Sequence, residues 1–279
     1  MIEERSDASM SERPDDLPDF TNPPLIEVLI DTQFEAFPGF QQIFASEVWD
    51  IFRDEFPQVE EQQALPPSFE TFGPPSRPQF NIQITRETAP TRFWFLSKNG
   101  NHLIQFQSDR FIRNWRKQND KDEEYPIFET IIDSFSDEFS KLSKYALNRY
   151  SHKLRINQCE VRYVNNIPID SKTDGNLVKK FFRFGDFGDL SIDDFFVKFR
   201  RTIRGDSGEP VCRVGCECGI AQTSSGEASI KLEIYARGAP SGTSLQDARL
   251  FCFSARNEIV RLFAEITTEY AHQIWGRKK

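Results

Sequence analysis

The sequence lacks the features by which most enzymes and membrane proteins are recognised. No apolar run approaches the roughly 20 residues that a transmembrane helix needs, and residues 1–20 contain no apolar stretch typical of a secretory signal. Phosphate-binding loops, dinucleotide-binding glycine patterns, nucleophile elbows and paired-histidine zinc motifs are all missing. Histidine occurs only three times, which leaves few candidates for a general base. We therefore expect a non-enzymatic cytoplasmic protein with no cofactor, no metal and no membrane contact, although catalysis by acidic residues stays open.

Cysteine is scarce, and its use indicates a reducing compartment. The five cysteines are an odd number without a secretory signal, which is typical of the cytoplasm. Cys212, Cys216 and Cys218 are close enough to propose a zinc site. Their spacing, however, places all three on one face of a predicted strand, and no histidine is near to complete a ligand set. We favour core packing and keep zinc as the alternative.

Basic residues are fewer than acidic residues, and the excess of acidic residues is distributed unevenly along the chain. The chain has 35 Lys and Arg against 43 Asp and Glu, a formal net charge of −8. Residues 1–20 hold seven acids and two bases, so −5 of that charge lies there and the other residues carry only −3. We predict a flexible acidic tail over residues 1–21 and a nearly neutral folded body. The overall charge therefore does not exclude an anionic partner.

Phenylalanine, by contrast, is abundant, with 27 among 279 residues, and most of it recurs at the spacings of strand and helix faces. Patterns of period two predict strands over residues 25–34, 80–85, 91–97, 102–115, 157–169, 193–203, 210–222 and 228–237. Patterns of period 3.6 predict helices over residues 41–56, 126–147, 176–184 and 245–275. Six of the 16 prolines fall in residues 57–78, which predicts a long loop.

The order of predicted elements occurs twice. Residues 22–150 and residues 151–279 both contain a strand, a helix, three or four strands and a long helix. We therefore predict an α+β fold of two tandem β-α-β(3–4)-α repeats, similar to helix-grip or TATA-binding-protein-like repeats. The repeats are expected to join into one curved antiparallel sheet whose single apolar face is covered by the long helices. This interpretation implies an internal duplication and rests on element order alone.

One predicted strand, within residues 105–117, interleaves bases with aromatic side chains. Such a strand is typical of surfaces that stack on bases and contact phosphates, of protein interfaces, or of an edge strand kept soluble by charge. A second polar-aromatic segment, residues 162–165, occupies a similar place in the second half. Buried arginine–asparagine networks are the alternative for both segments. The candidate binding residues are Arg110, Arg113, Asn114, Trp115, Arg116, Arg162, Tyr163 and Asn165.

Two loops contain strings that other proteins use for chemistry. Residues 205–208 read Gly-Asp-Ser-Gly, as around the nucleophile of chymotrypsin-like proteases, but the match ends there and a hairpin turn is favoured. Residues 185–194 hold four carboxylates, which raises a calcium or magnesium site. Their spacing is not that of an EF-hand, so a solvated acidic loop is favoured.

Four segments, residues 22–28, 105–116, 161–167 and 262–276, resemble a family of sporadically distributed prokaryotic conserved hypothetical proteins of roughly this length. The resemblance implies no activity and no catalytic residue. Patchy distribution is typical of horizontally exchanged genes, including antiviral defence and toxin–antitoxin loci, and the resemblance implies a place among them.

Together these observations predict a binding or interaction protein whose partner is a protein or a small ligand. The alternative is a nucleic-acid- or nucleotide-binding sensor or enzyme that uses the basic-aromatic strand. A self-assembling homo-oligomer is a third hypothesis. Salt separates the first two, because phosphate contacts weaken steeply as ionic strength rises.

Overall fold

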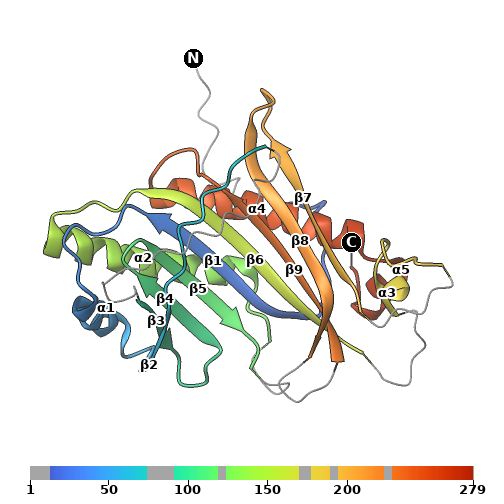
Figure 1. Ribbon diagram of the computed structural model, residues 1–279, viewed down its shortest axis with the longest axis horizontal. Helices are drawn as coiled ribbons and strands as arrows, with labels where there is room; N and C mark the ends of the chain where they lie inside the picture. Colours follow the sequence, from blue (N-terminus) through green and yellow to red (C-terminus); the bar gives the residue numbers. More distant parts are fainter. Residues whose placement is uncertain are drawn as a thin grey trace.

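The computed structural model describes residues 13–73, 91–118, 124–169, 177–188, 194–222 and 228–278. Within this part of the chain, nine strands form a single antiparallel sheet (Figure 1). Their order across the sheet is β2-β3-β4-β5-β1-β6-β9-β8-β7. The strands are β1 Leu25–Phe34, β2 Gln58–Gln63, β3 Thr91–Leu96, β4 His102–Gln107, β5 Arg110–Arg116, β6 Ile156–Pro168, β7 Phe196–Arg204, β8 Pro210–Gln222 and β9 Ala228–Gly238.

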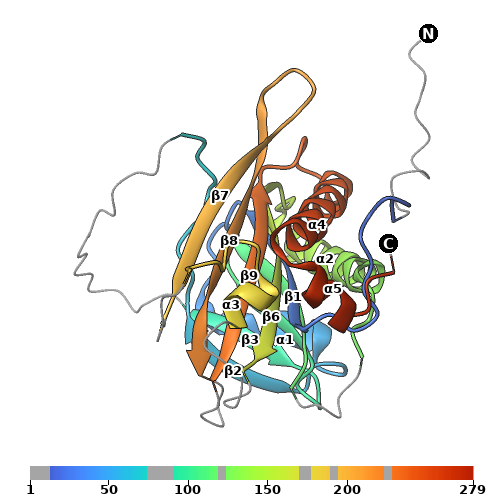
Figure 2. The same cartoon turned by 90° about the vertical axis from the view of Figure 1, so that its right-hand side faces the viewer.

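The two longest helices lie on the same side of this sheet (Figure 2). The 22-residue α4 packs on β6 and β9, and the 23-residue α2 packs on β5 and α4. No described helix is long and apolar enough to cross a membrane. The helical segments are the 3₁₀ turn η2 Gln42–Phe44 and the helices α1 Ala45–Phe52, α2 Phe128–Tyr150, α3 Leu177–Phe181, α4 Leu245–Ile266 and α5 Glu269–Ile274.

The predicted fold of two tandem helix-grip repeats is wrong. The structure is one continuous antiparallel sheet, and β1 lies in its middle, hydrogen-bonded to β5 on one edge and to β6 on the other. Strands β1 and β6 join the strands of residues 22–150 to those of residues 151–279, so that all nine strands form one sheet. The helices α1 and α3 have only eight and five residues, so neither half reproduces the predicted set of covering helices. Element order along the chain does not specify which strands pair, and this is why the prediction failed.

Further boundaries differ from the predictions. The predicted strand 102–115 is two strands, β4 and β5. The strand β2 lies inside the predicted loop 57–78; it is a polar edge strand, nearly all exposed, so no alternation marks it. The predicted strand 80–85 lies outside the described residues. The predicted helix 245–275 is two helices, because Thr267 is extended and Thr268 caps α5 by accepting a hydrogen bond from the Ala271 amide at 3.2 Å.

Several local predictions are confirmed. Strand β1 has the predicted bounds. The residues 205–208 form a turn between β7 and β8, in which Gly208 has φ +87°. All five cysteines are free and buried, and Cys212, Cys216 and Cys218 contribute to the core as the strand pattern indicates. In the acidic segment 185–194, exposed Asp186 pairs with Lys179 at 2.9 Å, whereas residues 189–193 lie outside the described part.

The phenylalanines build the core between the sheet and the helices. Phe111 of β5, for example, lies within about 6 Å of Phe52, Phe135 and Phe139, measured between ring centroids. Burial of each phenylalanine side chain stabilises the fold by roughly 2–3 kcal/mol. Residues 13–21, placed by the sequence in a flexible tail, are packed in the described structure: Leu17 is fully buried and a β-bridge joins Phe20 to Arg277.

Candidate functional site

The alternation of side chains along β5 and β6 divides the eight predicted binding residues between the two faces of the sheet. We call the side that carries α2 and α4 the helix face and the opposite side the open face; the open face includes Asp31, Glu160 and Tyr235. On the helix face lie Arg113, Trp115, Tyr163 and Asn165. On the open face lie Arg110, Asn114, Arg116 and Arg162.

Arg113 is buried against α2. Its Nε lies 3.0 Å from Oε2 of Glu138, its Nη1 donates to the Asn114 carbonyl, and its guanidinium lies over the Phe56 ring at 5.3 Å. Burial lowers the pKa of Arg113, an effect that the Glu138 carboxylate opposes. A guanidinium so enclosed is not placed to contact a phosphate in solvent.

The arginines of the open face are occupied by carboxylates and amides of the same chain. Arg162 reaches Glu160 at 2.7 Å and Glu233 at 2.6 Å. Arg110 donates to the Gln33 side chain at 2.7 Å and lies 3.5 Å from Asp31. This pairing neutralises positive charge that a nucleic acid would otherwise meet.

Asn114 belongs to a polar chain that crosses the open face. Its Nδ2 donates to Glu27 at 2.6 Å, and its Oδ1 accepts from Gln105 at 2.8 Å. Gln105 in turn accepts from Arg92 at 2.6 Å. Arg116 lies over the ring of Trp94 with a centroid distance of 5.6 Å. Buried networks of this kind stiffen a sheet when their members are satisfied.

The helix face contains a pocket of about 970 Å³ between the sheet, α2, α4 and the N-terminal segment. Three predicted residues, Trp115, Tyr163 and Asn165, are among its lining side chains. Most of the remaining lining is aromatic or aliphatic, with a few charged residues among it. These further residues are Arg13, Pro18, Asp19, Phe20, Thr21, Asn22, Pro23, Leu25, Lys117, Glu124, Tyr125, Ile127, Phe128, Glu129, Ile234, Ile259, Val260, Phe263 and Lys278.

Trp115 is the distinctive residue of this pocket. Its side chain is 1% exposed, and its ring centroid lies 5.3 Å from that of Tyr125. The indole Nε1–H has no acceptor among the residues that the structure describes. A buried donor without an acceptor costs about 1–3 kcal/mol. Nε1 is itself buried in the wall, so a ligand whose acceptor reaches it, with a shift of the side chains around it, recovers that free energy.

Two tyrosine hydroxyls meet in the same pocket. The hydroxyl oxygens of Tyr125 and Tyr163 lie 3.0 Å apart. Burial raises the pKa of Tyr125 well above its ordinary value and raises that of Tyr163 to about 12. Both therefore stay protonated at neutral pH and serve as hydrogen-bonding groups rather than as general bases. The Asn165 side-chain amide donates to the Leu232 carbonyl at 3.3 Å.

Most of the charges around the pocket are paired. Asp19 lies 3.4 Å from Arg13 and 3.1 Å from Lys278, and these contacts hold its pKa below the ordinary value despite the opposing effect of burial. Glu129 lies 3.0 Å from Arg256, whose buried guanidinium lies behind the pocket wall. The pocket thus combines an apolar, aromatic surface with a substantial share of polar and charged groups.

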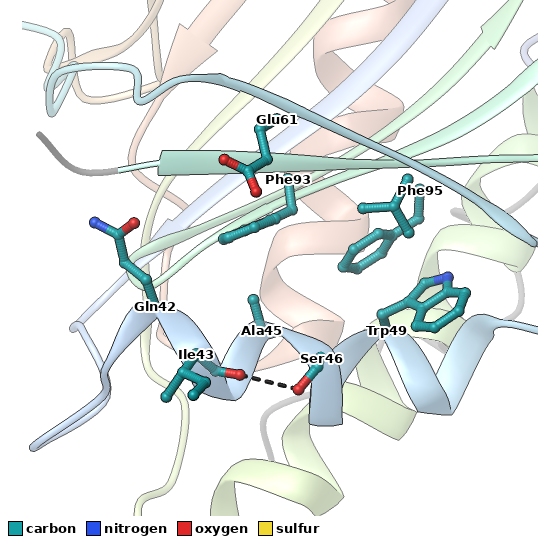
Figure 3. Close-up of a pocket in the computed structure, with 9 residues that line it drawn as sticks. Gln42, Ile43, Ala45, Ser46, Trp49, Glu61, Phe93 and Phe95 are labelled. Atoms are coloured by element: carbon teal, nitrogen blue, oxygen red, sulfur yellow. Dashed lines mark hydrogen bonds between the residues drawn. The ribbon is translucent and has the colours of Figure 1, made fainter.

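A second pocket, of about 350 Å³, lies between η2, α1, the edge strand β2 and its neighbour β3 (Figure 3). Phe93, Phe95 and Trp49 form its apolar wall. The Trp49 indole donates to the Phe56 carbonyl at 2.9 Å, and Ser46 donates to the Ile43 carbonyl at 2.9 Å. Neither of these donors needs a ligand, so this pocket is the weaker candidate.

Metal binding finds no support in the described residues, which contain no group of three or more potential ligands. Burial raises the pKa of the Cys212 and Cys216 thiols to about 12, so both are protonated at neutral pH. Cys212, Cys216 and Cys218 lie in the core, as the strand pattern predicts.

Comparison with protein-family models, curated proteins and solved structures finds no match for this chain. The family resemblance drawn from residues 22–28, 105–116, 161–167 and 262–276 stays a prediction. The residues that sequence reasoning missed are Phe20, in the predicted tail, and Tyr125, in a loop. Neither lies in a periodic pattern, so no sequence signal placed them beside Trp115.

Proposed function

We propose that this chain is a non-catalytic binding protein whose site is the 970 Å³ pocket on the helix face. Its ligand is a small, largely apolar molecule that carries a hydrogen-bond acceptor. The observation that carries the proposal is the buried Trp115 Nε1–H, which has no acceptor among the described residues, in the wall of an aromatic pocket. The pocket volume lies within the roughly 300–1,000 Å³ usual for ligand sites.

The pocket lining supports binding rather than catalysis. Neither histidine nor cysteine occurs among its described residues. The raised pKa values of Tyr125 and Tyr163 keep both hydroxyls neutral. Glu129 lies 3.0 Å from the Arg256 guanidinium, so its carboxylate is already engaged within the chain.

The alternative, a nucleic-acid or nucleotide partner, draws less support. Arg113 is enclosed with Glu138, and Arg162 is bound by Glu160 and Glu233. Their charge is therefore already neutralised, whereas phosphate binding depends on unpaired cations. A protein partner and membership of a defence system stay predictions from the sequence. The cytoplasm remains the proposed compartment, and the five free, buried thiols support it.

The test uses 8-anilinonaphthalene-1-sulfonate, an aromatic probe with sulfonate acceptors, added to the folded full-length chain. Val260→Trp fills the pocket, and Leu147→Trp on the exposed surface of α2 is the matched control. We expect saturable binding of one probe, at least tenfold weaker in Val260→Trp and unchanged in Leu147→Trp. Trp115→Phe keeps an aromatic ring but removes the donor, and should weaken binding about fivefold, the value of one hydrogen bond. Binding that survives Val260→Trp would contradict the proposal.

A further inference from the structure

Residues 64–73, which we call the strap, follow β2 and cross the open face of the sheet. The strap is held by four polar residues that lie opposite one another on adjacent strands. These are three glutamines and one arginine, Gln107, Arg110, Gln33 and Gln158, and we call them the glutamine row. The register pairs Gln107 with Arg110, Arg110 with Gln33, and Gln33 with Gln158, so the row runs across β4, β5, β1 and β6. It lies on the opposite side of the sheet from the pocket.

The glutamine row binds the backbone of the strap rather than its side chains. The Gln33 amide donates to the Ser68 carbonyl at 2.9 Å and accepts from the Ser68 N–H at 2.8 Å. The Gln107 amide makes the same two bonds with Leu65, each 3.0 Å long. A primary amide presents a donor and an acceptor side by side, as a residue of extended backbone does. Such pairing accepts almost any residue at positions 65 and 68.

The contacts also fix the direction of the strap. Arg110 donates to the Pro66 carbonyl at 3.0 Å, and Gln158 accepts from the Glu70 N–H at 3.3 Å. From Leu65 to Ser68 the strap passes from β4 to β1, two strand spacings or roughly 10 Å. Three extended residues span about the same distance. The strap is therefore an extended segment laid perpendicular to the strands.

Two contacts of the strap, both with Arg213, depend on side-chain identity. Glu70 lies 2.7 Å from Arg213 of β8, and the two side chains are 5% and 10% exposed. Arg213 also donates to the Thr71 carbonyl at 3.0 Å. Phe69 is 56% exposed, whereas the ring of Phe72 lies against the Arg213 guanidinium, 5.6 Å from its central carbon. Polar bonds, one ion pair and one cation–π contact, rather than apolar burial, thus hold the strap to the sheet.

We propose that the glutamine row and Arg213 form a binding surface for an extended peptide of a partner protein, and that the strap is its occupant within the same chain. The partner peptide carries an acidic residue two positions after the residue bound by Gln33, as Glu70 follows Ser68. A tethered occupant competes at an effective concentration in the millimolar range. The partner peptide therefore binds well only when the strap is displaced.

The probe is a fluorescein-labelled peptide with the sequence of residues 62–73, QQALPPSFETFG, added to the full-length chain. Glu70→Gln in the protein weakens its own strap, and Glu209→Gln, in the exposed turn before β8, is the matched control. We expect Glu70→Gln protein to bind the peptide at least tenfold more tightly than the wild type, and Glu209→Gln protein to bind like the wild type. A peptide with Gln in place of its glutamate should bind Glu70→Gln protein at least tenfold more weakly, because it cannot pair with Arg213.

A second measurement uses only the wild-type protein and so does not depend on how the variant folds. Hydrogen exchange of the wild type should show the amides of residues 65, 68 and 70 exchanging at least a hundredfold faster than those of β1. Exchange as slow as in β1, together with no gain in peptide binding by Glu70→Gln, would overturn the proposal and make the strap a fixed part of the fold.

Discussion

Nε of Arg113 lies 3.0 Å from Oε2 of Glu138, and both side chains are less than a tenth exposed. This ion pair joins β5 to α2 at the centre of the strand that the sequence marks as basic and aromatic. Breaking a buried pair costs more than an exposed pair contributes, because the remaining charge stays buried without its partner. The contact therefore gives Arg113 a structural role.

Glu138→Ala should lower the free energy of unfolding by about 3–5 kcal/mol, because it leaves the Arg113 guanidinium buried and unpaired. The double variant Arg113→Met with Glu138→Leu should recover most of that loss, since it removes both charges and retains the packing volume. Urea unfolding measures both values. Asp50→Ala, which removes the exposed partner of Arg53, is the control and should change little. If Glu138→Ala leaves the free energy of unfolding unchanged, Arg113 is not enclosed.

The pH dependence of stability should reveal Asp31, a buried carboxyl of the open face. Burial raises its pKa to about 7, although Arg110 opposes the shift. The folded protein thus holds this proton up to a higher pH than the unfolded chain does, so the contribution of Asp31 to the free energy of unfolding falls as pH rises from about 4 to 7.

Asp31→Asn removes that titration and supplies the measurement. The free energy of unfolding of the wild type, minus that of Asp31→Asn, should fall by on the order of 3 kcal/mol between pH 4 and pH 8. Taking the difference cancels the effect of other groups, such as His272, whose pKa burial lowers. A difference that rises over this interval would contradict the assignment.

The five cysteines should be unreactive in the folded protein. All are buried and free, and burial raises the pKa of the Cys212 and Cys216 thiols to about 12. Ellman's reagent should therefore titrate none of them rapidly under native conditions and all five after unfolding, because the thiolate is the reactive form. A thiol that reacts within seconds in the native state would place it outside the core.

Phe20 should control access to the pocket. Its ring lies 5.3 Å from that of Phe263, and the adjacent Thr21 and Asn22 amides donate to the carbonyls of Gly276 and Trp275 at 3.0 Å. Phe20→Ala should raise the dissociation rate of the anilinonaphthalene probe about tenfold, because the N-terminal segment then covers the pocket less well.

Stopped-flow displacement measures that rate, and Phe69→Ala, at an exposed position of the strap, is the control. Equal dissociation rates for the Phe20→Ala and wild-type proteins would show that the N-terminal segment does not cover the pocket.

Sequence patterns locate most strands and the long helices but not their arrangement. The period of hydrophobic residues indicates where β1, α2 and most of α4 lie, since each buries one continuous stripe or face. It is silent on which strands pair, because pairing joins residues far apart in the chain. Strand β1 could pair with β5, β6 or both, and only the three-dimensional structure establishes that it pairs with both.

Only part of the candidate site could be predicted from the sequence. In β5 both faces of the strand contain polar and aromatic residues, so alternation does not indicate whether Trp115 or Arg116 faces the helices. Tyr163 and Asn165 were identified as polar-aromatic neighbours, but the sequence left open whether they form a binding surface or a buried network and did not predict a pocket wall. Phe20 and Tyr125 lie in irregular segments whose position depends on contacts with the whole fold.

The central claim, that Trp115 offers a free donor to a ligand in the helix-face pocket, is tested most directly by NMR of the indole N–H groups. The four tryptophans give four such signals, assignable by single Trp→Phe variants. Titration with the anilinonaphthalene probe should shift the Trp115 signal saturably while leaving Trp49, which donates to Phe56, and Trp94, on the open face, unchanged. Binding that leaves the Trp115 signal in place, or that shifts the Trp94 signal instead, would contradict the account.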